Sequence, residues 1–249
     1  MCTLVILRRP GHPWPLVIAA NRDELRSRPA RPPGRHWPDR ADVVGGLDEA
    51  GGGSWLGIND HGVVAAVMNR EGSLGPAPGK RSRGELVLEA LDHAEAREAA
   101  GALADLHPDA YRSFNLVVGD VRDAYWLRHG EDGEIRVWPI PAGIHMLSST
   151  ELDDQDHPRI RAHLAHFRSA SAPDPDQGRW GEWQSLLASR TYPSEAGPAA
   201  AMTLDLGNGF GTVSSALIAV PAYPGLESKP IWLHADGPPD LVPFGPVAL

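Results

Sequence analysis

The chain has 249 residues, of which 42% are hydrophobic and 22% are charged, so it is long enough to bury a full core. Its formal net charge of −9 argues against a general nucleic-acid-binding surface, and its single cysteine excludes an internal disulfide framework. No apolar run approaches the roughly 20 residues that a membrane-spanning helix needs. We therefore expect a cytoplasmic protein with one domain over residues 1–249, no membrane span and no nucleic-acid partner.

Two β-rich segments at the start of the chain predict a hairpin. Thr3–Leu7 and Leu16–Ala20 are strand-like runs, separated by the turn-forming sequence Pro-Gly-His-Pro. The basic, proline-rich stretch 26–40 predicts a loop. If the two strands pair, the polar tetrapeptide Asn21–Glu24, which follows the second strand, lies opposite the start of the chain.

A second hairpin and two helices are predicted next. Trp55–Ile58 and Val63–Met68 flank the turn-forming sequence Asn-Asp-His-Gly. The segment Ser82–Glu85 reads Ser-Arg-Gly-Glu, which has the form of a capping box and predicts a helix start. Helical spacing of apolar residues follows it and recurs over residues 94–106.

The rest of the chain alternates between blocks of strands and blocks of helices. The order of strands, helices, strands, helices and strands favours a layered α+β fold over a βαβ wheel. We predict strands at Phe114–Val118, Ala124–Leu127, Ile135–Ile140, Ile144–Leu147, Gly211–Val220 and Lys229–Leu233, and helices at Arg159–Phe167 and Trp183–Ser189.

Cys2 directly follows the initiator methionine, whose removal would leave a cysteine with a free α-amine. The α-amine titrates near pH ~8 and a free thiol near ~8.5, so each is partly in its reactive form at neutral pH. A thiol with a base in its own residue is a nucleophile of the N-terminal type. The alternative is that Cys2 is only a small apolar residue at the start of a strand.

Three groups of polar residues follow apolar strands, where a layered fold can expose them to a cleft. They are Asn21–Glu24, Asn69, and the hydroxyl run at 148–150. A guanidinium near a cysteine lowers the thiol pKa, a carboxylate holds an amine, and an asparagine amide can donate to an oxyanion. The alternatives are a solvated loop, a turn and a helix N-cap, respectively.

Other polar patterns give no site. His157, His163 and His166 lie near aspartates, but histidines with this spacing are usually solvated, and we expect neither a metal nor a cofactor. The stretch Gly79–Ser82 lacks the upstream glycine spacing of a phosphate-binding loop.

These residues, taken in order, resemble the NRDE family, the family of transport and Golgi organisation protein 2. The resemblance covers residue 1 to about residue 220. The matching motifs are Met1-Cys2-Thr3, Asn21-Arg22-Asp23-Glu24, Gly45-Gly46 with Asp48, Gly52-Gly53, Trp55-Leu56-Gly57, Met68-Asn69-Arg70, Ser82-Arg83-Gly84-Glu85-Leu86, Phe114-Asn115-Leu116, and Gly211-Thr212 with Ser214-Ser215.

The resemblance implies a fold similar to the N-terminal nucleophile hydrolases, a four-layer αββα sandwich with Cys2 at the exposed start of a central strand. Within these hydrolases, the family resembles the branch with a cysteine nucleophile, which contains choloylglycine hydrolases and penicillin V acylases. In that branch Glu24 would stand at an aspartate and Asn21 at an arginine, which leaves Arg22 as the nearby cation.

Further site residues follow from the same resemblance. Asn69 matches the branch's oxyanion asparagine, and Ser149 falls at its second asparagine. Val213 stands where the family motif has an arginine. The catalytic set implied is Cys2, Asn21, Arg22, Glu24 and Asn69, with Asp23, Trp55, Ser148, Ser149 and Ser214 as substrate-binding residues.

The function predicted first is amidohydrolysis of a linear or cyclic amide that is not a peptide backbone, with Cys2 attacking the carbonyl. The alternative is a non-catalytic carrier of haem or another hydrophobic ligand, because eukaryotic members are linked to haem and lipid trafficking. A catalytically inactive structural domain is a third possibility. The expected partner is thus a small-molecule amide or a hydrophobic ligand. The sequence leaves open whether the protein forms a homo-oligomer.

Overall fold

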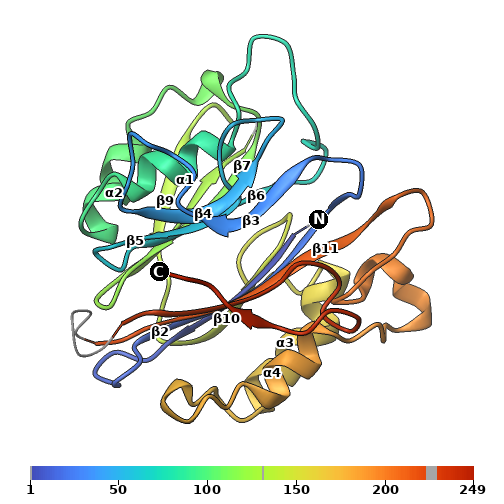
Figure 1. The fold of residues 1–249 in the computed structure, drawn as a ribbon. Coiled ribbons are helices and arrows are strands. Elements are labelled where there is room, and N and C mark those ends of the chain that lie inside the picture. The colour runs from blue at the N-terminus through green and yellow to red at the C-terminus, as the bar shows by residue number, and fades with distance from the viewer. Residues whose placement is uncertain (1, 131, 223–228) are drawn as a thin grey trace.

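Two antiparallel β-sheets form the centre of the computed structural model, which describes residues 2–130, 132–222 and 229–249 (Figure 1). The six-stranded sheet contains β10 (Gly143–Leu147), β1 (Thr3–Arg8), β2 (Leu16–Leu25), β11 (Phe210–Val220), β12 (Ile231–Ala235) and β13 (Gly245–Pro246), in that spatial order. The seven-stranded sheet contains β3 (Ala30–Gly34), β4 (Val43–Asp48), β5 (Leu56–Asn59), β6 (Val64–Asn69), β7 (Phe114–Gly119), β8 (Ala124–His129) and β9 (Ile135–Pro139).

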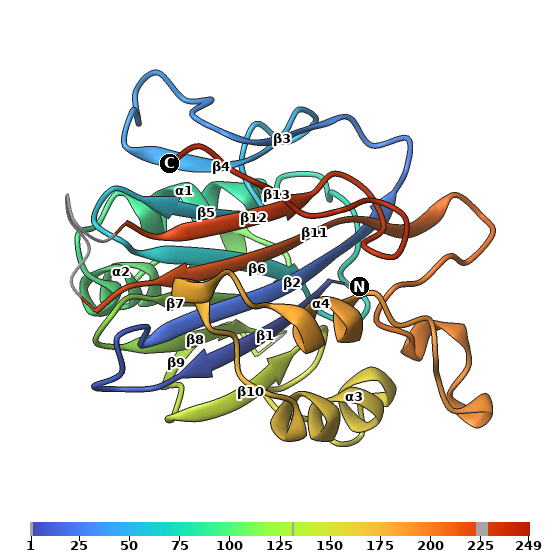
Figure 2. The ribbon, with the colours of Figure 1, turned by 60° about the horizontal axis from the view of Figure 1, so that its bottom comes forward.

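Helices cover the outer face of each sheet (Figure 2). The helices α1 (Gly84–Leu91) and α2 (Ala96–Ala104) pack on the seven-stranded sheet, and α3 (Pro158–Ser169) and α4 (Gly181–Leu187) pack on the six-stranded sheet. Short 3-10 turns lie at Pro108–Ala110, Pro175–Gln177, Ser194–Ala196 and Pro198–Ala200. The architecture is therefore the expected four-layer αββα sandwich.

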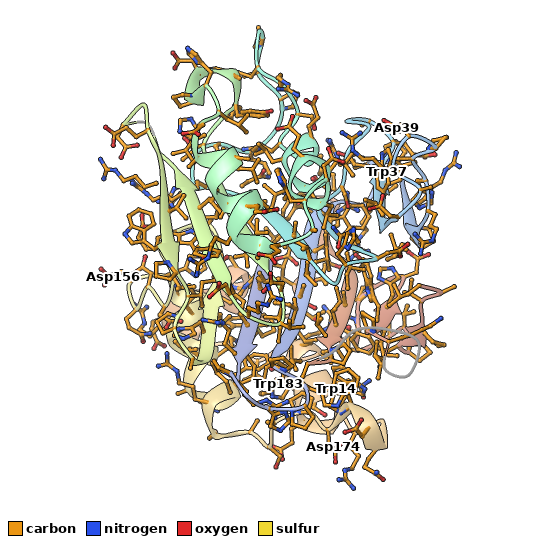
Figure 3. All side chains as sticks on the ribbon, turned by 90° about the vertical axis from the view of Figure 1, so that its left-hand side faces the viewer. Trp14, Trp37, Asp39, Asp156, Asp174 and Trp183 are labelled. Atoms are coloured by element: carbon orange, nitrogen blue, oxygen red, sulfur yellow. The ribbon has the colours of Figure 1, made fainter. Side chains whose placement is uncertain are left out.

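The alternation of side chains along the strands builds separate apolar layers. In β1 and β2, even-numbered residues such as Leu4 and Ile18 face the other sheet, whereas odd-numbered residues such as Val17 face α3 and α4. Each buried aliphatic side chain stabilises the fold by roughly 1.5–3 kcal/mol. Trp14 and Trp183 belong to the helix-side layer, at the lower end of Figure 3. This alternation decides which polar side chains of β2 point into the space between the sheets.

The structure confirms both predicted hairpins and extends one of them. β2 continues past Ala20 to Leu25, so the polar tetrapeptide is part of a strand and not the start of a loop. The predicted loop 26–40 was wrong in part because β3 lies inside it. β3 is an edge strand, where the missing N–H of proline disturbs no inner ladder. The strands β4 and β13 were not predicted.

The predicted capping box at the start of α1 is wrong, although the helix is present. Among the described residues, the Ser82 hydroxyl accepts a bond only from the Gly84 amide, and Arg83 occupies the N-cap position with no side-chain capping bond. The Glu85 carboxylate accepts a bond from Arg81 Nε at 2.7 Å. The opposite charge four residues earlier draws Glu85 away from the backbone.

Within the described residues, no helix is both long enough and apolar enough to cross a membrane.

Candidate functional site

The β1–β2 pairing places Cys2 beside the polar end of β2. Thr3 pairs with Asn21 and Leu4 with Ala20, so continuing the register puts Cys2 opposite Arg22. Cys2 is partly buried and packs against the apolar layer between the sheets. The only cysteine therefore faces the interior of the sandwich at one end of a central strand.

Cys2 lines a cavity of about 400 Å³ that opens at this end of the sandwich. The six-stranded sheet contributes Arg22, Asp23 and Glu24 to its wall, and the seven-stranded sheet and nearby loops contribute the remaining lining. Those residues are Arg28, Asp48, Ala50, Gly51, Ser54, Trp55, Val67, Asn69, Gly75, Pro76, Ala77, Lys80, Arg81, Ser82, Arg83, Gly84 and Arg112. A cavity of this size falls in the range that holds small organic ligands.

The surroundings of Cys2 disfavour its thiolate. Burial raises the pKa of the Cys2 thiol, the Asp23 carboxylate raises it further, and Arg22 lowers it. The sulfur lies 3.9 Å from the Asp23 carbonyl oxygen, to which the thiol can donate. The resting side chain is therefore a thiol, and attack on a carbonyl needs a base that removes its proton.

Arg22 reaches into the cavity and stacks on Trp55. Its guanidinium carbon lies 3.9 Å from the ring centroid, a cation–π contact. The ring packs closely over Gly46, where an added Cβ would lie 2.2 Å from the Trp55 ring. Among the described residues the Arg22 guanidinium has neither an ion pair nor a hydrogen bond, and burial lowers its pKa. Its donors remain free to bind a ligand.

Asp23, one residue further along β2, belongs to a buried polar network on the helix side. Arg159 Nη1 donates to Asp23 Oδ2 at 2.7 Å, and both side chains are fully buried. The Thr212 hydroxyl donates to Asp23 Oδ1 at 2.7 Å, and Arg159 also donates to the Thr3 hydroxyl at 2.6 Å. This network fixes the carboxylate beside the end of β1.

Asn21 shares the helix side of β2 with Asp23 and does not face the cavity of about 400 Å³. Its amide nitrogen donates to the carbonyl oxygens of Leu187 and Met202, each at 2.9 Å, and its oxygen accepts from Ser215 at 2.7 Å. We predicted that Asn21 positions the amine of Cys2. These three bonds instead connect β2 to β11 and to the chain around α4.

Glu24, which we predicted to position the Cys2 amine, lines the cavity. One carboxylate oxygen accepts from the Leu25 amide at 2.8 Å, and the other lies 3.9 Å from Arg28 Nε. Arg28 itself forms two bonds with Asp48, at 2.7 and 3.1 Å. Glu24 thus lies beside the Arg28–Asp48 ion pair. Asp23, and not Glu24, is the carboxylate whose charge acts on the Cys2 thiol.

Asn69 ends β6 on the opposite wall of the same cavity. It is partly buried, and its amide makes no hydrogen bond with another described residue. An amide without a partner can donate to an oxygen that develops negative charge. The structure therefore brings Cys2 and Asn69 to one cavity from two different sheets.

The hydroxyls of Ser148 and Ser149 bond to protein groups instead of lining the cavity. Ser148 Oγ donates to the Cys2 carbonyl oxygen at 2.9 Å, and Ser149 Oγ lies 3.3 Å from His157 Nε2. Burial lowers the pKa of His157 to about 4, so this imidazole is neutral at pH 7. The arrangement corrects the predicted substrate contact, because Ser148 orients the backbone of Cys2 instead.

Ser214 lines a second cavity of about 20 Å³ behind Cys2, together with Ala20, Ala66 and Met68. This volume suits about one water molecule. Val213 is the extra residue of a bulge in β11, because the register of the β2–β11 pair shifts between Thr212 and Ser214.

Two features of the site were not predicted from the sequence, namely the basic wall of the main cavity and the partner of Asp23. Lys80, Arg81, Arg83 and Arg112 line the cavity, and the run from Lys80 to Arg83 was a signal that could have been read. Arg159 gave no such signal, because 136 residues separate it from Asp23. The histidines considered for a metal lie elsewhere, and the described residues contain no cluster of three metal-binding side chains.

Solved structures of known proteins show which class of fold this is. The chain superposes with a TM-score of 0.60 on the Caenorhabditis elegans ortholog of N-acylethanolamine-hydrolyzing acid amidase, at 14% identity over 90% of this chain and 94% of that chain. It superposes with a TM-score of 0.51 on a mutant conjugated bile acid hydrolase from Clostridium perfringens, at 11% identity over 100% of this chain and 97% of that chain. The fold is that of the N-terminal nucleophile hydrolases.

A family model identifies the chain more closely. The model of Transport and Golgi organisation 2 matches residues 1–220, so the chain belongs to this family, as the sequence motifs predicted. It is 34% identical over 153 residues to the Bos taurus Transport and Golgi organization protein 2 homolog, covering 55% of this chain and 51% of the relative. The human homolog is 34% identical over 140 residues, covering 52% and 49%. The match spans about half the length of these curated relatives.

Proposed function

We propose that this protein hydrolyses a non-peptide amide with Cys2 as an N-terminal nucleophile. The observation that carries this proposal is the shared cavity, in which Cys2 and Arg22 from one sheet face Asn69 from the other. The similarity in fold to an N-acylethanolamine-hydrolyzing amidase and a conjugated bile acid hydrolase supports it. Residues 1–249 form one catalytic unit in this proposal, because the six-stranded sheet combines strands from the first and the last parts of the chain.

The first chemical step requires the removal of Met1. The Cys2 α-amine can then act as the base, and Asp23, whose charge raises the pKa of the Cys2 thiol, is the carboxylate that we propose to position it. The neutral amine takes the thiol proton, directly or through a water molecule, and the sulfur attacks the carbonyl carbon of the amide. Asp23 replaces Asn21 and Glu24 in the positioning role, because its carboxylate is the one held next to the end of β1.

The remaining steps use the same groups. The Asn69 amide donates to the oxygen that becomes negative in the tetrahedral intermediate. The protonated α-amine gives its proton to the leaving nitrogen, the C–N bond breaks, and an acyl thioester remains on Cys2. Water then attacks the thioester while the amine accepts its proton, and the acid and the free thiol are released.

The proposal is tested by intact-mass spectrometry followed by trapping of the thioester. We expect protein without Met1 and an acyl adduct on Cys2 after incubation with a panel of N-acyl amides. Cys2→Ala is the matched control, because alanine also permits methionine removal but has no nucleophile. Retained Met1, or no adduct with any acyl donor from protein shown to lack Met1, would contradict hydrolysis and favour the carrier alternative. No histidine lines the described cavity, so a haem carrier would need a different ligand there.

A further inference from the structure

The main cavity is basic although the protein as a whole is acidic. Six basic side chains line it against three carboxylates, whereas the whole chain has a formal net charge of −9. The basic side chains are Arg22, Arg28, Lys80, Arg81, Arg83 and Arg112, and the acidic ones are Asp23, Glu24 and Asp48. A concave site lined by one sign of charge focuses its field into the cavity and concentrates ligands of the opposite sign.

Two of the basic side chains are already neutralised by carboxylates. Arg28 pairs with Asp48 at 2.7 Å, and Arg81 pairs with Glu85 at 2.6 Å and with Glu89 at 2.8 Å. Arg28 and Asp48 cancel, and Arg81 is outnumbered by its two carboxylates, so these groups add no positive charge to the wall. The attraction for an anion therefore has to come from the remaining cations.

Arg83 and Arg112 are held by neutral acceptors instead of carboxylates. Arg83 donates to the carbonyl oxygens of Ser73 and Ser113 at 2.8 and 3.0 Å, and Arg112 donates to the carbonyl oxygen of Gly72 at 2.9 Å. Burial lowers the pKa of Arg83 to about 10, with a further contribution from the charge of Arg112. Both guanidiniums are fixed in place, and no carboxylate among the described residues pairs with them.

Arg22 completes this wall from the other sheet. Its guanidinium stacks on Trp55 and is not paired with any described residue, and it interacts electrostatically with Cys2. Arg83 also interacts electrostatically with Cys2. A planar guanidinium binds carboxylate or phosphate oxygens through two parallel N–H donors. The guanidinium N–H donors of Arg22 can thus bind a ligand group near Cys2.

Building on the proposed hydrolysis, we propose that the substrate carries an anionic group, a carboxylate or a phosphate, which binds to Arg22 in the field of Lys80, Arg83 and Arg112. The charge lies on the same molecule as the scissile amide, because Arg22 and Cys2 line one cavity. The acidic group of Asp23 does not cancel this attraction, since Arg159 pairs with it from behind. Neutral amides of the same shape are poorer substrates.

The test compares matched pairs of amides. One series carries the anion on the amine side, as in an N-acylglycine or an N-acyl-O-phosphoethanolamine, and its neutral partners are the glycine methyl ester and the N-acylethanolamine. A second series carries a carboxylate on the acyl side, as in the monoamide of a dicarboxylic acid, with its methyl ester as partner. We expect kcat/KM to be at least about tenfold higher for the anionic member of one series, and the preference to shrink as salt increases.

Variants then assign the preference to the basic wall. Arg22→Met is expected to remove most of the ratio between anionic and neutral substrates, and Arg22→Lys to retain part of it. The ratio cancels any effect of Arg22 on the thiol itself. Arg97→Met is the matched control, because Arg97 is exposed on α2 and pairs with Asp123 outside the cavity. A ratio near one in both series, or a ratio that Arg22→Met leaves unchanged, would overturn the inference.

Calorimetry on the Cys2→Ala protein separates this inference from the proposed hydrolysis. We expect the anionic amide to bind at least about tenfold more tightly than its neutral partner, and this difference to require Arg22. If no acyl adduct forms on wild-type Cys2 but the binding preference is present, hydrolysis fails and the anion site stands. If adducts form and the binding preference is missing, the anion site fails and hydrolysis stands.

Discussion

Adjacent residues of β2 lie in two unlike environments. Asp23 faces the helix layer, where its charge is compensated by fully buried Arg159 and a bond from Thr212. Arg22 faces the space between the sheets, where it stacks on Trp55 and has no carboxylate partner among the described residues. We call the helix side of β2 the closed face, because its charges are compensated by buried partners. We call the side with Arg22 the open face, because no described residue accepts a bond from the guanidinium there.

The comparison teaches how a four-residue polar motif serves two purposes at once. Because side chains alternate across a strand, Asn21 and Asp23 connect the sheet to the helix side, whereas Arg22 and Glu24 line the cavity. A buried charge without a partner costs several kcal/mol, so the closed face tolerates few substitutions. The open face lines the cavity, where no described carboxylate pairs with Arg22.

The largest expected effect is on the closed face. Arg159→Met leaves the buried Asp23 carboxylate without its ion pair and should lower the free energy of unfolding by about 3–5 kcal/mol. Arg22→Met, on the open face of the same strand, should cost less than about 1 kcal/mol. Denaturant unfolding of the two variants measures both values, and equal losses would show that the two faces do not differ as described.

The helix side should also respond to mild acid. Burial lowers the pKa values of His157 and His163 to about 4, whereas an unfolded histidine titrates near ~6.5. Between these values the unfolded chain binds protons that the folded chain does not, so the free energy of unfolding falls as pH falls from about 6.5 to about 4. The expected loss is roughly 1–3 kcal/mol for each histidine.

Denaturant unfolding at a series of pH values measures this loss. His163→Gln should make the fall between pH 6.5 and 4 shallower, whatever it does to stability at pH 7. An unchanged pH dependence in that variant would rule out His163 as one source.

The open face depends on close packing between Gly46 and Trp55. Gly46→Ala places a methyl group against the ring and should lower the free energy of unfolding by about 1–3 kcal/mol. Gly101→Ala is a matched control in α2, since an added Cβ there meets nothing within 4 Å, and it should stabilise the helix by about 0.5–1 kcal/mol. Thermal unfolding checks both, and a neutral Gly46→Ala would mean that Trp55 moves freely.

The smallest effect concerns the thiol. Because burial raises the pKa of Cys2, its alkylation rate should rise with pH around a midpoint above the ~8.5 of a free thiol. Arg22 lowers this pKa, so Arg22→Met should move the midpoint further up. The rate of iodoacetamide labelling against pH measures the shift. A midpoint that moves down in the variant would contradict the placement of Arg22 beside the sulfur.

Much of the fold and part of the candidate site could be predicted from the sequence. Apolar strand runs identified the hairpins, and the ordered motifs identified the family and the four-layer sandwich. Cys2, Asn69 and Trp55 were expected near one cleft, and they line one cavity. The predicted strand ended at Ala20, however, because polar residues have no apolar alternation to mark a strand, and this hid the division of Asn21–Glu24 between two faces.

By itself the sequence determined most of the local elements, the family and the position of the single cysteine, because these depend on neighbouring residues and on short motifs. Only the tertiary structure decided which carboxylate lies beside Cys2 and where the cavity gains its positive charge. Asp23 meets Arg159, which is 136 residues away, and Arg22 meets Trp55 across two sheets. Charge compensation depends on distance in space, and the packing of the two sheets sets that distance.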